Sequence, residues 1–288
     1  MRSLTISSPA KVNLFLKVLG KRRDGYHELI TLFHRISLQD QLILKKIDQP
    51  KFRLLVHHPK LKRTHENLIY RAYQLLRKVA TWKGGVQVTL KKNIPIAAGL
   101  GGGSSNAAHF LLGMTQLFNL RLPMKTLIQL GSELGSDVPF FLHEVNQAIG
   151  TGRGEKIKPL PSPVKFWFVL LISPFGISTP AVYKKLKAPA LTRISRDATI
   201  TSAFLKARKK GQKLPKLQND LFSASCRIQP QLKQLDAFFD QLGAARHLMS
   251  GSGPTMFSIH KSKREAKHMA RLIRGRKRSA SVFVCHTY

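Results

Sequence analysis

The chain has 288 residues, enough for about two domains, and with 43% hydrophobic and 22% charged residues it is neither disordered nor fibrous by composition. Its 49 Lys and Arg residues against 14 Asp and Glu residues give a formal net charge of +35, which indicates an anionic partner such as nucleic acid, an anionic membrane surface or a phosphorylated ligand. The longest apolar run, residues 166–172, is too short to cross a membrane, and the first residues lack a secretory pattern, so we expect a cytoplasmic protein.

The N-terminal part of the chain is predicted to be rich in strands, with one helix. Short apolar runs predict strands at residues 6–18, 42–44, 52–56 and 86–90, and a turn rich in glycine and basic residues at 20–25. Between them, a helix is predicted over residues 67–80. Its apolar face consists of Leu68, Ala72, Leu75, Leu76 and Val79. This mixture is typical of an α+β domain.

A glycine-rich stretch follows, in which Gly99, Gly101, Gly102 and Gly103 occupy four of five positions. Glycine permits positive φ angles and lets a ligand approach the backbone amides closely. Apolar residues then recur at helical spacing up to Phe118, so the stretch is expected to open directly onto a helix N-terminus. Free N–H groups and the helix dipole make such a place an anion site.

Two well-known phosphate loops do not match this stretch. A P-loop needs a lysine after its glycines, and none follows here. A dinucleotide fingerprint needs glycine at its sixth position, which counted from Gly99 is Ser104. A flexible linker is also disfavoured, because a predicted strand and an apolar helix bracket the glycines.

The C-terminal part predicts a βαβ unit, with strands at residues 255–259 and 281–285 around a helix at 263–274. Basic residues concentrate at 206–216 and at 261–278, where nine of eighteen positions are Lys or Arg. The second concentration is either a phosphate-contacting patch or the solvated face of a helix. We favour the helix, because no aromatic residues are interleaved to stack on bases. Its buried stripe would consist of Ala266, Met269, Ala270 and Ile273.

The two cysteines, Cys226 and Cys285, form no CxxC pair. Their separation excludes a zinc ribbon, thioredoxin-like redox chemistry and a disulfide scaffold. We expect both to be buried and to behave as small hydrophobic residues.

Residues 95–107 resemble the central motif of the GHMP small-molecule kinases. Several other segments resemble one family within that superfamily, the 4-diphosphocytidyl-2-C-methyl-D-erythritol kinases. These segments are residues 8–14, 23–29, 135–141 and 250–255, with smaller matches at 66–72 and 218–221. Their order and spacing agree, and together they cover nearly the whole chain.

The resemblance implies an α+β fold of two lobes. Residues 1–160 would form an ATP-binding lobe like the second domain of a ribosomal-protein S-five type fold, and residues 161–288 a ferredoxin-like lobe. It also implies a reaction in the isoprenoid pathway that avoids mevalonate. The γ-phosphate of ATP would pass to the 2-hydroxyl of a small-molecule cytidyl diphosphate substrate. The short apolar runs separately predict that there is no membrane partner.

The resemblance implies that Lys11 and Asp137 are the catalytic residues. Phosphoryl transfer needs positioning and charge stabilisation more than a strong base. Our hypothesis is that Asp137 orients the hydroxyl and takes its proton late, while Lys11 holds Asp137 and neutralises developing charge. Taken alone, Asp137 could instead be the cap of a helix or turn. The residues implied to bind ATP are Pro95, Ile96, Ala97, Ala98, Gly99, Leu100, Gly101, Gly102, Gly103, Ser104 and Ser105.

Recognition of the cytidine part of the substrate requires an aromatic surface on which the base can stack and hydrogen bonds to the edge of the base. Tyr26 and His27 offer both, and the resemblance places Tyr183 on the other side of the ring. Asn13 and Thr179 are further implied substrate contacts. The simpler interpretation of an isolated Tyr-His pair is a packed tyrosine in a turn next to a surface histidine.

A Mg²⁺ ion is expected with ATP, and Ser105 is the expected hydroxyl ligand. Position 106 is Asn, whereas many related kinases have Ala or Asp there. This difference puts only the contacts at the start of the helix in doubt.

Two other functions compete with this prediction. The first is another GHMP kinase, acting on mevalonate, phosphomevalonate or homoserine, which Tyr26 and His27 argue against. The second is a basic nucleic-acid-binding protein on this scaffold, which the charge favours and the intact motifs oppose.

Overall fold

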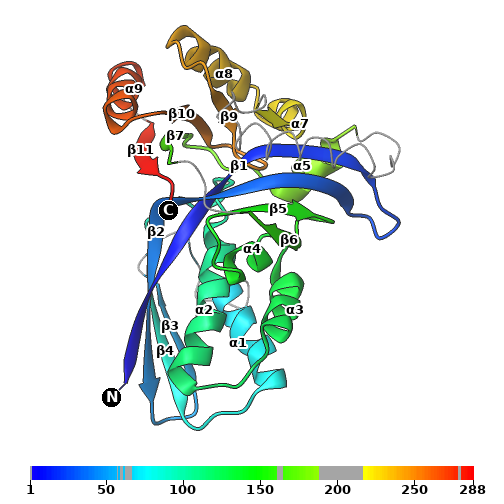
Figure 1. Ribbon diagram of the computed structural model, residues 1–288, viewed down its shortest axis with the longest axis vertical. Coiled ribbons are helices and arrows are strands. Elements are labelled where there is room, and N and C mark those ends of the chain that lie inside the picture. The colour runs from blue at the N-terminus through cyan, green and yellow to red at the C-terminus, as the bar shows by residue number, and fades with distance from the viewer. Residues whose placement is uncertain are drawn as a thin grey trace.

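The computed structural model describes residues 2–56, 58, 61, 67–160, 165–187, 217–277 and 280–288. These residues form two sheets with helices packed against each (Figure 1). The seven strands of the first sheet are β1 (Ser3–Lys21), β2 (His27–Ile47), β3 (Phe52–Val56), β4 (Gly85–Lys91), β5 (Gln147–Thr151), β6 (Lys156–Pro159) and β8 (Gln218–Asn219). The four of the second are β7 (Trp167–Ile172), β9 (His247–Met249), β10 (Met256–His260) and β11 (Ser281–His286). The α+β prediction is confirmed.

Two long antiparallel strands, β1 and β2, organise the first sheet and run along both lobes (Figure 1). β2 pairs with β4 through its C-terminal half and with β5 through residues 31–34. The sequence predicted only residues 42–44 of β2 as strand. The rest was missed because its N-terminal half is buried on both faces, which removes the polar alternation that marks a half-exposed strand.

Four helices cover one face of the first sheet. They are α1 (Leu68–Val79), α2 (Gly102–Phe118), α3 (Met124–Leu134) and α4 (Val138–Leu142). The predicted helix over residues 67–80 is α1, and the Asn67 side chain caps it by accepting from the Ile69 amide at 2.9 Å. α2 is buried on most sides, so its N-terminal end is held firmly between the sheet and its neighbours.

The predicted βαβ unit is confirmed in the second sheet. β10 and β11 both pair antiparallel with β7 and flank it, joined by α9. The helices of this lobe are α5 (Thr179–Lys185), α7 (Phe222–Ile228), α8 (Gln231–Gln241) and α9 (Lys263–Arg276). The buried residues of α9 are those predicted: Ala266, Met269, Ala270 and Ile273. The basic residues at 261–277 therefore belong largely to the solvated face of an amphipathic helix, whereas residues 206–216 lie outside the described residues.

The two sheets share a hydrophobic core. Leu14 and Ile36 of the first sheet belong to one buried cluster with Phe168 and Phe257 of the second. β8 also crosses between the halves of the chain, because it pairs in parallel with β1. The boundary at residues 160 and 161 stays a prediction.

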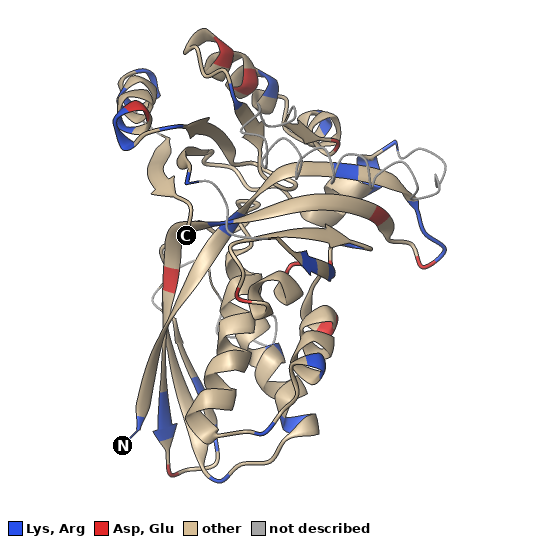
Figure 2. Cartoon of the chain, viewed as in Figure 1, with Lys and Arg blue, Asp and Glu red and all other residues tan. Residues whose placement is uncertain are grey.

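Cys226 and Cys285 are both buried and unbonded, as expected. None of the helices within the described residues is long and apolar enough to span a membrane. Lys and Arg residues are spread along elements of both lobes, with few Asp and Glu residues among them (Figure 2).

Candidate active site

A cavity of about 500 Å³ opens where the N-terminal end of α2 meets β1 and the loops of the second lobe. It adjoins a second cavity of about 760 Å³, and five residues line both: Leu29, Ser136, Arg153, Thr179 and Tyr183. Except for Ser105, every site residue predicted from the sequence lines one of the two. The first holds Lys11, Asn13, Asp137 and residues 95–104, and the second holds Tyr26 and His27.

The glycine loop connects β4 to α2, and its conformation explains its composition. Gly99 and Gly101 have φ angles of +73° and +68°, in the left-handed region that favours glycine. A Cβ atom on Gly101 would lie 3.0 Å from side-chain carbons of Lys11. The first intrahelical bond of α2 runs from the Ser105 amide to the Gly101 carbonyl, so the amides of residues 102–104 have no acceptor within the helix. These amides are the ones for which the sequence predicted an anion site, and that function stays a prediction.

A second glycine-rich segment, residues 250–254, packs on the first loop. The Ser250 hydroxyl donates to the Gly99 carbonyl at 3.0 Å. Buried Asn219 supports this segment by donating to the carbonyls of Met249 and Gly251 at 2.8 and 2.7 Å. The contact of Asn219 with this segment explains why residues 218–221, which are distant in sequence from the glycine loop, belong to the motifs on which the family resemblance rests.

Lys11 and Asp137 meet at the floor of the first cavity. The Lys11 ammonium lies 3.2 Å from a carboxylate oxygen of Asp137 and donates to the Asn13 side chain at 2.6 Å. Lys11 is buried, whereas about a third of the Asp137 side chain is exposed to the cavity (32%). Asp137 precedes α4, but its side chain makes no capping hydrogen bond. A cap role therefore does not account for the carboxylate, which is free to face a ligand.

The aromatic residues lie at the second cavity. His27 stacks on Tyr183, with ring centroids 5.2 Å apart, while exposed Tyr26 lies under the guanidinium of Arg153 at 4.6 Å. Burial, assisted by the positive charge of Lys21, lowers the pKa of His27. Its ring is therefore neutral at pH 7 and keeps one donor and one acceptor nitrogen. Burial and then the nearby Asp137 carboxylate raise the pKa of Tyr183.

Ser105, the hydroxyl expected from the sequence to bind magnesium, lines neither cavity. The residue is fully buried, and its hydroxyl accepts from Ser8 at 2.8 Å, on the side of α2 away from the cavity. Ser104, its half-exposed neighbour, lines the cavity instead. The helical rotation between consecutive residues, about 100°, separates the two hydroxyls.

Behind the loop lies a buried polar network centred on Asp40. Its carboxylate accepts from the Lys92 ammonium at 2.6 Å, from the amides of Asn93 and Ile94 at 2.7 and 2.8 Å, and from the side chain of Asn106 at 2.9 Å. It thereby ties the segment that enters the glycine loop to the helix that leaves it. The sequence left the contacts of Asn106 at the start of α2 in doubt, and the structure shows its side chain bonded to Asp40 there.

Sequence reasoning missed Arg153 as well as Asp40. Arg153 lies in the turn between β5 and β6 and lines both cavities, where it brings positive charge beside Tyr26. Its glycine neighbours, Gly152 and Gly154, have positive φ angles and were the one local signal of a specialised turn.

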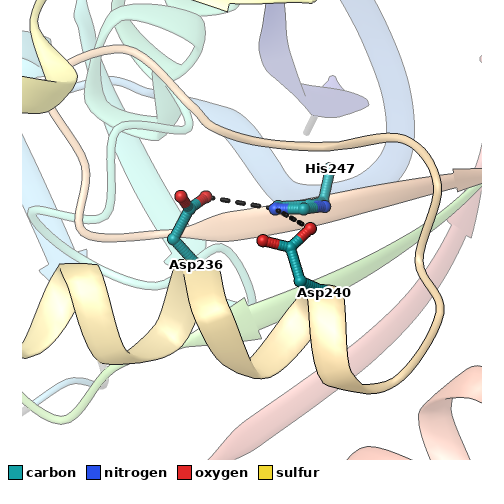
Figure 3. Close-up of side chains that lie close together, drawn as sticks. All are labelled: Asp236, Asp240 and His247. Atoms are coloured by element: carbon teal, nitrogen blue, oxygen red, sulfur yellow. Dashed lines mark hydrogen bonds and ion pairs between the residues drawn. The ribbon is translucent and has the colours of Figure 1, made fainter.

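A further titratable cluster lies outside the cleft, on α8 and β9. The His247 ring is 3.1 Å from Asp236 and 3.8 Å from Asp240 (Figure 3). Its other nitrogen bonds to the Ala244 carbonyl at 2.9 Å. The hydrogen bond with Asp236 is the largest cause of the raised pKa of His247. The arrangement is an ion pair when the ring is protonated.

Comparison with known proteins agrees with this geometry. Residues 67–144 match the model of the GHMP kinases N terminal domain. The chain is 39% identical to a 4-diphosphocytidyl-2-C-methyl-D-erythritol kinase from Syntrophus aciditrophicus, an alignment covering 97% of this chain and 98% of the relative. A crystal structure of 4-(cytidine 5'-diphospho)-2C-methyl-D-erythritol kinase superposes with a TM-score of 0.80 at 35% identity, covering 98% of both chains.

A homoserine kinase from Cytophaga hutchinsonii, with a TM-score of 0.72 at 14% identity, covers 100% of this chain and 95% of its own. At that identity it shows the fold alone. The identities over nearly the whole length, together with the motifs gathered in one cleft, show that the chain belongs to the 4-diphosphocytidyl-2-C-methyl-D-erythritol kinases of the GHMP superfamily.

Proposed function

We propose that this kinase transfers the γ-phosphoryl group of ATP to the 2-hydroxyl of 4-diphosphocytidyl-2-C-methyl-D-erythritol. The observation that carries the proposal is the pairing of Asp137 with Lys11 at 3.2 Å, in the lining of the first cavity beside the glycine loop and next to Ser136, which lines both cavities. One cavity then holds the phosphoryl donor and the other the cytidyl end of the acceptor.

The glycine loop binds the phosphates of ATP in this proposal. The free amides at the start of α2 supply hydrogen bonds, and the helix dipole adds positive potential. The amides of residues 102–104 and the hydroxyl of Ser104 are available for this purpose. The apolar lining farther along the first cavity, which includes Leu68 and Ile96, suits the purine ring.

The transfer step needs one proton acceptor and nearby positive charge. The 2-hydroxyl oxygen attacks the γ-phosphorus, the bond from that phosphorus to the β,γ-bridging oxygen breaks, and ADP leaves with the electron pair. Asp137 orients the hydroxyl and takes its proton late. Lys11 holds the carboxylate and stabilises the charge that develops on the transferring group.

The second cavity suits a cytidine diphosphate. Tyr26 and Tyr183 provide aromatic surfaces for the base, and neutral His27 has a hydrogen-bonding edge.

The rest of the substrate has its own proposed contacts. Asn13 and Thr179 are proposed contacts nearer the reacting group. Arg153 and the lysines of the lining, Lys21, Lys184 and Lys187, offset the charge of the diphosphate.

The oxygen donors of the first cavity fit a Mg²⁺ ion that travels with ATP. Mg²⁺ prefers phosphate, water and carboxylate or hydroxyl oxygens. Ser104, rather than buried Ser105, would supply the hydroxyl, and the Asp137 carboxylate is close by in the lining. When bound, the ion neutralises charge on the phosphate oxygens.

The test is an assay of ADP release with four acceptors offered separately: the cytidyl-methylerythritol substrate, mevalonate, phosphomevalonate and homoserine. We expect turnover with the first alone, and phosphorus NMR should identify the 2-phosphate as product. Turnover of another acceptor in its place would contradict the proposal. Tight binding to random duplex DNA that is lost steeply with salt, without ATP turnover, would support the nucleic-acid alternative.

A further inference from the structure

Thr31, on β2, is a buried residue joined to the catalytic pair by a chain of hydrogen bonds. Its hydroxyl donates to the Phe15 carbonyl at 2.7 Å and accepts from the Asn13 side-chain nitrogen, also at 2.7 Å. The Asn13 side-chain oxygen in turn accepts from the Lys11 ammonium at 2.6 Å, and that ammonium pairs with Asp137. No motif in the sequence marks Thr31.

The donor and acceptor chemistry of this chain permits only one orientation of the Asn13 amide. The Thr31 hydroxyl has a single hydrogen, which a backbone carbonyl occupies, so the group can only accept from Asn13. The nitrogen of the Asn13 amide must therefore face Thr31, and its oxygen must face Lys11. The reverse orientation would place an NH₂ group against an ammonium that has no lone pair to accept a hydrogen bond.

Burial makes this arrangement hard to replace. Thr31, Asn13 and Lys11 line the first cavity, yet Thr31 and Asn13 are each only 2% exposed and Lys11 is 3% exposed. The loss of one partner therefore leaves a largely buried polar group without its hydrogen bond, which is costly. The register of β1 against β2 shifts between Asn13 and Phe15. This irregularity accompanies the bonds that bring the side chain of Asn13 and the carbonyl of Phe15 to the same hydroxyl.

We propose that Thr31 is a positioning residue for phosphoryl transfer: it fixes the orientation of the Asn13 amide, and through it the place of the Lys11 ammonium beside Asp137. This inference rests on the proposed function. A Lys11 without a fixed partner on the Asn13 side occupies several positions, and phosphoryl transfer is sensitive to such misplacement.

The test is steady-state kinetics of Thr31→Val, which keeps the shape of the side chain and removes the hydroxyl. We expect kcat to fall about tenfold, with the KM for ATP changed by less than about twofold, because the glycine-loop amides that hold the nucleotide are untouched. Thr31→Ser keeps the hydroxyl and should retain kcat within about threefold of wild type. An unchanged kcat in Thr31→Val would overturn the proposal.

A double-mutant cycle separates positioning from a general structural effect. In the Asn13→Ala background, Thr31→Val should lower kcat by less than about twofold, because the amide through which Thr31 acts is gone. Equal losses in both backgrounds would contradict the proposal. Thr287→Val is the matched control: it removes a buried hydroxyl that contacts His34 and Phe166, outside the residues lining the cleft, and should leave kcat unchanged.

If Thr31→Val does not fold, kcat can be compared between Thr31→Ser and Thr31→Cys instead. Serine and cysteine are similar in size, but the cysteine thiol is a poor hydrogen-bond acceptor. The cysteine variant should then show the lower kcat, and equal values would overturn the inference. Wild-type enzyme separates the two proposals. If wild type does not phosphorylate the cytidyl substrate, the proposed function fails, whereas an active wild type with an equally active Thr31→Val refutes only the role of Thr31.

Discussion

The Lys92 ammonium lies 2.6 Å from the Asp40 carboxylate, and both groups are buried beneath the glycine loop. Burial lowers the pKa of Lys92, and the charge of Asp40 opposes that shift. The pair therefore holds a charged lysine where an unpaired one would be costly. Because Asp40 also binds Asn93, Ile94 and Asn106, this pair couples the stability of the fold to the shape of the glycine loop.

We predict that Asp40→Ala destabilises the protein by about 3–5 kcal/mol, because it leaves Lys92 buried without its partner. Urea denaturation should detect the loss. Asp24→Ala removes a carboxylate that pairs with Arg22 at the surface and should have little effect. Replacing both buried partners with apolar residues, Asp40→Leu with Lys92→Met, should recover part of the stability. A loss no larger than that of Asp24→Ala would contradict this account.

Asp137→Asn should separate chemistry from nucleotide binding. The substitution keeps the shape of the side chain but removes the proton acceptor beside Lys11. We expect kcat to fall about 10²-fold or more, with the KM for ATP nearly unchanged. Asp240→Asn, on the exposed side of α8, is the control and should retain full activity. Normal turnover by Asp137→Asn would remove the residue from the mechanism.

The parts of the site that could be predicted from the sequence are those in which a local backbone conformation limits the choice of residue. Gly99 and Gly101 adopt positive φ angles, and the helix after them follows the apolar spacing, so the loop and the helix that begins after it could be predicted from one short segment. The buried face of α9 was predictable for the same reason, since four residues at helical spacing define it.

The parts that could not be predicted depend on pairing between distant segments. Thr31 and Asp40 bond to residues of β1, the glycine loop and α2, and no local pattern marks such partners. The burial of Ser105 rather than Ser104 depends on how α2 is rotated against Ser8 in β1. In each case the register of β2 and the packing of the helix, not the spacing of residues, decide the contact.

Gly101→Ala should impair both stability and catalysis. Its φ angle of +68° disfavours a side chain, and the added Cβ would lie 3.0 Å from Lys11 and 3.2 Å from Phe141. We expect a loss of about 1 kcal/mol or more and a fall in kcat/KM of about tenfold. Gly275→Ala in α9 is the matched control. It has open space around its added Cβ and should gain about 0.5–1 kcal/mol with unchanged activity. Equal behaviour of the two variants would contradict the strain argument.

The ion pair of His247 with Asp236 should make stability depend on pH in a defined direction. The pKa of His247 is raised in the folded protein, first by its hydrogen bond with Asp236 and further by the Ala244 carbonyl, while burial opposes both. A group with a raised folded pKa binds its proton more tightly when folded, so its contribution is fully present below the unfolded pKa of about 6.5 and is lost as the pH rises through the folded value. Asp236→Asn removes the main cause.

The measurement is the free energy of unfolding of wild type and Asp236→Asn at about pH 5.5 and about pH 8.5, on either side of the histidine titration. At the lower pH, wild type should have a larger free energy of unfolding than Asp236→Asn. At the higher pH, this difference in free energy between the two proteins should shrink. Asp24→Asn, at a surface pair without histidine, controls for the loss of a negative charge in a chain of net charge +35. A difference that grows with pH would mean that His247 is not protonated against Asp236 in the folded state.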